Sequence, residues 1–327
     1  MRVAVVGAGI MGAAAAWALS DDGHDVVLLE QFRVGHARGS SHGRSRIFRL
    51  AYPEVEWVRL AERALAGWRE LERQSGVSVL KLDGLVELVA DPADSSREAL
   101  EAVGARCQLL TADEARARWP LGVPDGWYVL FQPEAGIVRA DLAYRAFLDV
   151  ARARGALLEE ERRVDDVASL DADVVVVTAG AWVGRLVENV PVRVTRETLA
   201  YFRRDGAPLP SVGELNPETR GHLMYSLRDP EHGLKAGWHH AGTETDPDET
   251  GEPDPERVDR IADWVARVHP DADPRPVAVE TCLYTNTADE EFILERRGAV
   301  VLCSACSGHG FKFAPAVGRR VASLVRG

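Results

Sequence analysis

The sequence predicts an α/β protein in which a domain with a parallel sheet is interrupted by a unit with an antiparallel sheet. Apolar runs at Arg2 to Val6 and Asp25 to Leu29 flank a helical stretch, which is the pattern of parallel strands joined by a crossover helix. Short alternating runs punctuated by glycine and proline occur in residues 81–138 and 191–275 and indicate antiparallel strands. A chain of 327 residues is also long enough for two domains. We therefore assign residues 1–80, 139–190 and 276–327 to a discontinuous parallel-sheet domain, and residues 81–138 and 191–275 to the inserted domain.

The glycine-rich start of the chain predicts a nucleotide site. Gly7, Gly9 and Gly12 follow the first strand directly, and Ala13 to Leu19 has helical character. In such a unit the first glycine permits the turn, the second lets the backbone approach a pyrophosphate, and the third lets helix and strand pack closely. Glu30 ends the second strand, close to the roughly 20-residue spacing of a carboxylate that binds a ribose hydroxyl. A glycine-rich turn without a ligand is the alternative, but Glu30 favours an ADP-containing dinucleotide. The motif does not separate NAD from FAD.

Periodicity predicts the remaining elements along the chain. Apolar residues between Trp57 and Leu71 recur at helical spacing and predict an amphipathic helix whose tryptophans pack on a core. Helical periodicity returns from Ala140 to Arg154. The apolar run from Ala172 to Val177 predicts a buried parallel strand whose carboxyl end meets a cofactor, with a purely structural turn as the alternative. Asp254-Pro255 predicts the start of a further helix, and Gly298 to Leu302 predicts a last buried strand.

Composition limits the classes of partner. The 39 basic and 51 acidic side chains give a formal charge of −12, which opposes binding to nucleic acid or to an anionic membrane. No apolar run approaches the roughly 20 residues that span a bilayer, and the first strand begins at once, so we expect no signal peptide and a cytoplasmic protein. The four cysteines are expected to be free thiols. Cys303 and Cys306 form a C-x-x-C pair without a second ligand pair at metal-site spacing, so we expect no metal.

Four motifs, together with the stretch Gly233 to His239, span almost the whole chain. They are the glycine-rich start at 7–12, the segment Gly39 to Arg49, the pair Cys282 and Tyr284, and the segment Ser307 to Phe313. With these motifs the chain resembles monomeric sarcosine oxidase and its relatives, the N-methyltryptophan, pipecolate and fructosyl amino acid oxidases of the D-amino acid oxidase superfamily. The resemblance implies an FAD-binding Rossmann-like domain of the glutathione-reductase type with an inserted antiparallel-sheet α+β substrate domain. It also implies a monomer.

The resemblance further implies FAD joined covalently through a thioether to Cys282. A thiolate is a strong nucleophile that can add to an electron-poor form of the flavin ring. A small buried core thiol is the alternative for Cys282, and Cys306 is a lesser rival for the covalent link. Gly308 and Gly310 are expected to let the backbone approach the flavin, where a side chain would clash. The residues that the motifs assign to the cofactor are Gly7, Gly9, Ile10, Met11, Gly12, Glu30, Gln31, Ser41, His42, Arg46, Ala179, Gly180, Trp182, Cys282, Gly308, Gly310, Phe311 and Lys312.

A substrate carboxylate in a partly dry pocket requires a cation. The resemblance assigns this role to Arg49 and Lys312, for which a surface salt bridge and an ordinary helix-end lysine are the alternatives. It assigns oxygen activation to Lys235, helped by Arg46, because a preplaced cation stabilises the negative charge of superoxide. A lysine on a strand can equally face solvent. The residues expected to line the substrate cavity, each of which could instead be a core residue, are Tyr225, His239, Tyr284 and His309.

These residues predict an FAD-dependent oxidase of a secondary or cyclic amino acid. A hydride equivalent passes from the carbon next to nitrogen to flavin N5, which gives an imine, and O2 is reduced to hydrogen peroxide. Histidines in the cavity can favour the neutral amine through hydrogen bonds. Alternatives are a primary (D-)amino acid oxidase or flavin dehydrogenase of the same superfamily, an NAD-dependent dehydrogenase, and a catalytically inactive FAD-binding protein.

Several positions depart from the family pattern. The chain is shorter between Arg163 and Asp173, where the family usually has a strand hairpin, and it ends soon after Phe313. Arg44 stands where an acidic residue is usual, and Trp238 stands where a tyrosine is common. Because these changes reshape the cavity mouth, a larger or cyclic amino acid is as plausible a substrate as sarcosine.

Overall fold

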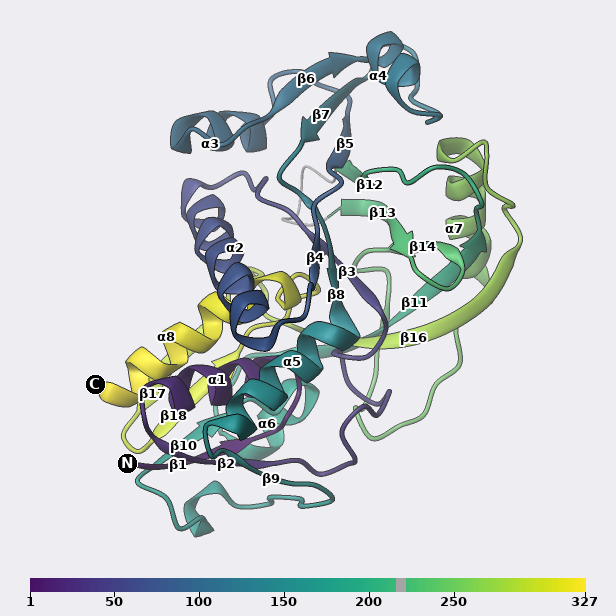
Figure 1. The fold of residues 1–327 in the computed structure, drawn as a ribbon. Helices are drawn as coiled ribbons and strands as arrows, with labels where there is room; N and C mark the ends of the chain where they lie inside the picture. Colours follow the sequence, from purple (N-terminus) through teal and green to yellow (C-terminus); the bar gives the residue numbers. More distant parts are fainter. Residues whose placement is uncertain (216–221) are drawn as a thin grey trace.

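The computed structural model describes residues 1–215 and 222–327, which are built around two main sheets. Figure 1 shows both chain termini at the outer end of the smaller sheet, whereas the larger sheet occupies the other half of the molecule. The predicted α/β class, with a mostly parallel sheet and a largely antiparallel sheet, is confirmed. Within these residues, no helix combines the length and the apolar character that crossing a membrane requires.

The smaller sheet has the strand order β17-β18-β10-β1-β2-β9. Its parallel strands are β1 (Arg2–Val6), β2 (Asp25–Leu29), β9 (Leu157–Glu159), β10 (Val174–Val177) and β18 (Val300–Ser304), and β17 (Ile293–Arg297) is an antiparallel edge. All of β10 is buried, as expected for a central parallel strand covered on both faces. The predicted strands at 2–6 and 25–29 are confirmed, and the strand predicted from Ala172 is confirmed from Val174 onward. The last strand begins two residues later than predicted, because residues 298 and 299 form the turn from β17.

Two helices, α1 (Ile10–Asp21) and α8 (Ala314–Arg326), contact this sheet, and two more pack on them. Helix α1 contacts α5 (Ala140–Ala153) and α8, and α8 also contacts α2 (Val55–Ser75). The two helices α1 and α8 approach so closely that a Cβ at Gly318 would lie 2.3 Å from the Ala14 oxygen. The predicted helices at 13–19, 57–71 and 140–154 are confirmed, and Trp57 and Trp68 are buried as predicted.

The larger sheet has the order β15-β11-β14-β13-β12-β5-β7-β6, and β16 pairs with β11 outside that path. Its strands are β5 (Leu85–Val89), β6 (Gln108–Thr111), β7 (Tyr128–Gln132), β11 (Arg193–Arg203), β12 (Ser211–Leu215), β13 (His222–Asp229), β14 (Gly233–Trp238), β15 (Thr243–Glu244) and β16 (Pro276–Asn286). A third, small sheet is made of β3 (Ser45–Phe48), β8 (Gly136–Arg139) and β4 (Leu80–Lys81).

Two short helices lie where only strands and turns were predicted. They are α3 (Ser95–Val103) and α4 (Ala112–Arg118), and each begins at a side-chain cap, Asp94 and Thr111 respectively. Helix α7 (Pro255–Val268) begins at Asp254 as predicted, because the Asp254 carboxylate accepts two backbone N–H groups of the first turn. The remaining short elements are η1 (Val167–Ser169), η2 (Gly180–Trp182), α6 (Val183–Leu186) and η3 (Phe311–Phe313).

The pairing of β16 with β11 creates one polar face of the larger sheet. Strand β16 starts at residue 276, which the sequence analysis assigned to the parallel-sheet domain, but it pairs along most of its length with β11. The domain limits themselves stay a prediction. Paired residues point to the same side of a sheet, and so do alternate residues of a strand. The registers Glu197↔Cys282, Leu199↔Glu280, Tyr201↔Lys235 and Tyr225↔Gly237 therefore place these side chains on one face.

Candidate functional site

A cavity of about 440 Å³ extends from the carboxyl ends of β1, β2 and β10 to the polar face of the larger sheet. Every candidate residue from the sequence lines it except Gly12, so Cys282 and Lys312 meet in one cavity. A Cβ at Gly12 would lie 1.9 Å from the Gly7 oxygen, so Gly12 allows the close packing predicted for it without reaching the cavity. In the described part of the chain, no three histidine, cysteine or acidic side chains gather as a metal site would require.

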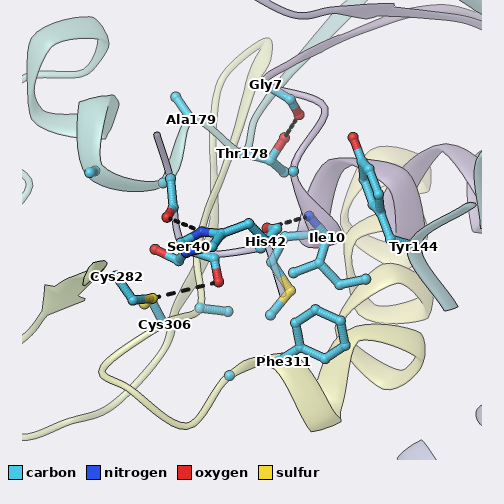
Figure 2. A pocket seen from close by; sticks show the side chains of 18 of the residues that line it. Gly7, Ile10, Ser40, His42, Tyr144, Thr178, Ala179, Cys282, Cys306 and Phe311 are labelled. Carbon is cyan, nitrogen blue, oxygen red and sulfur yellow. Dashed lines mark hydrogen bonds between the residues drawn. The ribbon is translucent and has the colours of Figure 1, made fainter. Parts of the chain in front are cut away.

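The turn after β1 forms one end of the cavity. Gly7 has φ +94°, and a Cβ there would lie 2.7 Å from the Thr178 oxygen. The backbone angle and the lack of space therefore each require glycine. The Thr178 hydroxyl donates to the Gly7 oxygen at 2.7 Å and thereby ties the turn to the end of β10 (Figure 2). The Ile10 N–H at the start of α1 donates to the Ser41 hydroxyl at 2.9 Å, which brings the segment 39–49 beside the helix N-terminus.

The residues at this end fit the ADP part of a dinucleotide. Glu30 is buried at the end of β2, and its carboxylate accepts the Ala8 N–H at 2.8 Å and the Phe32 N–H at 3.0 Å. The carboxylate is thus held beside the glycine turn, as the ribose-binding role requires. A helix N-terminus favours a phosphate group, and cationic side chains line the same end. These cations are Arg145, Arg162, Arg163 and Arg185.

Cys282 is a buried thiol on the cavity wall. Its sulfur lies 3.9 Å from the Ser40 oxygen and 3.7 Å from the Leu283 oxygen, and Figure 2 shows it directed toward the Ser40 backbone. Burial raises the pKa of Cys282 to about 11, although Arg46 and Lys235 oppose this shift. The thiol therefore holds its proton at neutral pH. Cys306 lines the same cavity, and its sulfur accepts the Thr285 N–H at 3.4 Å.

The chain has 36 arginines and only three lysines, and two of the three, Lys235 and Lys312, line this cavity. Lys235 on β14 is buried, with its Nζ 3.3 Å from the Glu280 carboxylate. Burial, and secondly Arg46, lowers the pKa of Lys235 to about 8, whereas Glu280 raises it. Lys235 therefore does not face solvent.

Lys312 is buried on η3 and is held by neutral groups. Its Nζ donates to the His309 oxygen at 2.7 Å and to the Tyr52 hydroxyl at 3.0 Å. Within residues 1–215 and 222–327, no carboxylate oxygen lies within ion-pair distance of this Nζ. Burial, and secondly Arg49, lowers the pKa of Lys312 well below its usual value. Lys312 is therefore a buried cation without an anionic partner in this part of the chain, not an ordinary helix-end lysine.

Arg49, in contrast, has an anionic partner. It is only 2% exposed, which excludes the surface salt bridge considered from the sequence, and its Nη1 donates to Glu87 at 3.1 Å. Glu87 also accepts from the Gln132 amide at 2.9 Å, and Gln132 in turn accepts the N–H groups of Leu50 and Ala51. Sequence reasoning missed Glu87 and Gln132. Their signal is one polar residue in the middle of the otherwise apolar strand β5, Glu87, and one at the end of β7, Gln132.

Tyr52, also missed from the sequence, joins Arg49, Lys312 and His309. The Arg49 guanidinium carbon lies 4.1 Å from the centroid of the buried Tyr52 ring. His309 Nε2 lies 3.1 Å from the Glu290 carbonyl, which can only accept, so Nε2 carries a proton. The Tyr52 hydroxyl lies 3.2 Å from His309 Nδ1 and accepts from Lys312.

The predicted aromatic residues lie together on the polar face. His239 Nδ1 is 3.2 Å from the Tyr284 hydroxyl, and Tyr225 packs edge-on to His239. The structure also gives a different reason for glycine at 308 and 310. A Cβ at Gly308 would lie 2.3 Å from the Tyr284 ring, and one at Gly310 would lie 2.0 Å from the Ala305 oxygen. Protein neighbours thus exclude a side chain at both positions. The expected approach of this backbone to the flavin stays a prediction.

Comparisons with known proteins agree on one family. The family model described as "DAO: FAD dependent oxidoreductase" matches residues 2–324. The chain is 32% identical to peroxisomal sarcosine oxidase of Homo sapiens over 96% of this chain and 89% of that protein. It is 31% identical to monomeric sarcosine oxidase of Bacillus sp. (strain B-0618) over 98% of this chain and 91% of that protein. The solved structure of NikD, an amino acid oxidase, is 25% identical with a TM-score of 0.85, covering 99% of this chain and 93% of that chain.

The first prediction concerns the buried pair of Arg49 and Glu87. Glu87→Gln keeps the side-chain shape but leaves the Arg49 charge without its partner, so the free energy of unfolding should fall by about 3 kcal/mol. Urea unfolding measures this change. The matched control is Glu101→Gln, which removes the exposed pair with Arg97 and should hardly move the midpoint. Equal midpoints for the two variants would show that the buried pair does not stabilise the fold.

Proposed function

Because the chain belongs to the DAO family of FAD dependent oxidoreductases, we propose that it is an oxidase of secondary or cyclic amino acids that uses O2. FAD, when bound, takes a hydride equivalent from the carbon next to the amine nitrogen, which leaves an imine, and passes the electrons to O2 to give hydrogen peroxide. The names of the sarcosine oxidase relatives support an N-substituted amino acid as substrate. We further propose a monomer, from the name of the Bacillus relative.

One observation carries the proposal: a buried lysine without an anionic partner in the described chain lies in the same cavity as the nucleotide end. An unpaired buried cation is costly, and a carboxylate ligand relieves that cost. An amino acid substrate brings such a carboxylate. Lys312 is therefore its primary partner, and Arg49, already paired with Glu87 and lining the cavity, adds positive potential.

The chain's own residues would hold the cofactor along the whole cavity. Gly7, Gly9 and Glu30 would hold the ADP part at one end. The segment 39–49 would run beside the isoalloxazine, where Arg46 lines the cavity and lies 5.5 Å from the Phe311 ring centroid. Cys282 would form the thioether. Since its thiol is protonated at neutral pH, the cationic pair Arg46 and Lys235 would favour loss of that proton before the bond forms.

The cavity favours a neutral amine, which the reaction needs. An ammonium group placed among Arg46, Lys235 and Lys312 would be repelled by three cations. Tyr225, Tyr284 and His239 provide aromatic walls and hydrogen-bonding groups without a formal negative charge at neutral pH. These residues would therefore select the uncharged amine while the carboxylate is held at Lys312.

The first test of this function is a substrate panel. Purified holoenzyme is assayed for oxygen uptake and peroxide with sarcosine, other N-methyl amino acids, proline, pipecolate and primary D-amino acids. We expect equal amounts of oxygen consumed and peroxide formed with a secondary amino acid, and none with N-methylamines that lack a carboxylate. Flavin reduction without oxygen uptake would instead identify a dehydrogenase. Turnover of primary amino acids alone would instead identify a primary amino acid oxidase.

The second test concerns the covalent link. Acid denaturation and peptide mapping should leave the yellow colour on the peptide that contains Cys282. Cys282→Ala should release all flavin into the acid supernatant, because its replacement has no nucleophile, whereas Cys306→Ala, the control thiol in the same cavity, should retain it. Colour on the Cys306 peptide, or full release of the flavin from the unmodified protein, would disprove the link to Cys282.

The third test is the pH dependence of carboxylate binding at Lys312. The ammonium binds the carboxylate, and the pKa of Lys312 is lowered by burial, so affinity should fall as pH rises through that lowered pKa. Propionate has no amine to titrate, and its inhibition constant should rise about tenfold per pH unit above that pKa. Lys312→Met should weaken propionate binding by about 2–3 kcal/mol, roughly 30- to 150-fold, and abolish this pH dependence.

The control for this test is Lys81→Met, which removes the only lysine outside the cavity; Lys81 is exposed on β4. This variant should keep both the affinity and the pH dependence of the unmodified enzyme. If Lys312→Met binds propionate as tightly as the unmodified enzyme, Lys312 is not the carboxylate partner.

A further inference from the structure

The carboxylate of Glu280 lies behind Lys235 as seen from the cavity. Lys235 lines the cavity, whereas Glu280 and Tyr201 are not among the lining residues. The Lys235 Nζ is 3.3 Å from Glu280 Oε1 and 5.3 Å from the Tyr201 ring centroid. The Tyr201 hydroxyl donates to the same oxygen of Glu280. The three side chains therefore form a layer beneath the cavity wall.

The sheet register fixes this arrangement. Tyr201 is in β11, the strand between β14, which carries Lys235, and β16, which carries Glu280. All three side chains point to the same face. Tyr201 pairs with Lys235. Leu199, two residues before Tyr201 and on the same face, pairs with Glu280. The loop at Gly43 closes over them: a Cβ there would lie 3.5 Å from the Lys235 Nζ and 3.7 Å from Glu280 Oε1.

The charges around Lys235 explain why it needs this carboxylate. Its side chain is almost fully buried, whereas the Glu280 side chain keeps 30% exposure and stays partly hydrated. Arg46 repels the ammonium, and the other ionisable groups near it, His42, Tyr201 and Cys282, are neutral at pH 7. Burial opposes ionisation of Glu280, but Lys235 and the Tyr201 hydroxyl outweigh it and lower the Glu280 pKa. Glu280 is thus the ionised partner of Lys235.

We infer that Glu280 is a positioning residue for the reaction with oxygen: held by Tyr201, it keeps Lys235 at the cavity wall as an ammonium ion. This inference rests on the proposed oxidase function and on the role of Lys235 in it. A charged Lys235 stabilises the negative charge that forms when an electron reaches O2. A neutral Lys235 cannot do so. Glu280 therefore sets the pH range in which the enzyme is reoxidised.

The direct test uses the scarcity of lysine in the chain. Holoenzyme with ¹⁵N-labelled lysine side chains contains three labelled groups, Lys81, Lys235 and Lys312, which lysine-to-methionine variants assign. In Glu280→Gln the titration midpoint of Lys235 should fall by about one pH unit, because an opposite charge within a few ångströms has been removed. The signals of Lys81 and Lys312 should not move. Glu214→Gln, which removes a carboxylate paired with Arg267 elsewhere in the sheet, should leave Lys235 unchanged.

The kinetic test follows reduced enzyme as it reacts with O2. Lys235, with a pKa of about 8, is half protonated at pH 8, so a fall of about one unit should slow the reaction of Glu280→Gln about fivefold at pH 8 and hardly at pH 6. Reduction by substrate should keep its rate. Combining Glu280→Gln with Lys235→Met should slow the oxygen reaction no more than Lys235→Met alone.

An unmoved Lys235 midpoint in Glu280→Gln would overturn the inference, as would an equal loss of oxygen reactivity at pH 6 and pH 8. If Glu280→Gln does not fold, Glu280→Asp serves in its place and should shift the midpoint in the same direction by less. Failure of the proposed function is distinguishable, because then no amino acid in the panel yields peroxide, whereas the lysine titration still reports whether Glu280 controls the charge of Lys235.

Discussion

The site depends on keeping the buried cations Arg49, Lys235 and Lys312 on the wall of one cavity. Burying a charge costs several kcal/mol unless a partner compensates it. Arg49 has Glu87, Lys235 has Glu280, and Lys312 has the Tyr52 hydroxyl and a backbone oxygen. The compensation of the buried charge thus decreases in three steps. Arg49 has a fully buried anion, Lys235 has a partly exposed one, and Lys312 has only neutral acceptors. This order makes Lys312 the position where an incoming anion gains the most.

The larger sheet positions these groups because side chains alternate between its two faces along each strand. Lys235, Gly237 and His239 alternate along β14 and just past its end, and Glu280, Cys282 and Tyr284 alternate along β16. Of these residues, Lys235, His239, Cys282 and Tyr284 line the cavity. Glycine is needed at position 237, because a Cβ there would lie only 2.7 Å from the Tyr225 hydroxyl. A single-residue slip of β16 against β11 would turn Glu280, Cys282 and Tyr284 away together. The register of this strand pair therefore decides where these three side chains lie.

The sequence predicts the parallel sheet and the cavity residues well, because local signals report both. Glycine spacing and apolar runs define β1, α1, β2 and β10, and motifs mark Cys282, Lys235 and Lys312. The sequence does not reveal Glu87, Gln132, Tyr52 or Glu280 as partners, since each acts through a contact between segments far apart in the chain: Glu87 meets Arg49, and Glu280 meets Lys235. Helices α3 and α4 were missed because they are short, although Asp94 and Thr111 are ordinary cap residues.

Arginine and lysine have different functions in this cavity. Arginine keeps its charge in almost any environment, whereas burial can remove the charge of lysine. This chain uses 36 arginines and only three lysines, yet it places two of those lysines where burial acts on them most strongly. Arg49 and Arg46 therefore supply constant positive potential. Lys235 is kept near its titration range by Glu280, and Lys312 has no carboxylate partner in the described chain. Near the proposed substrate, the cavity wall thus combines the fixed charges of Arg46 and Arg49 with Lys235 and Lys312, whose charge depends on their partners.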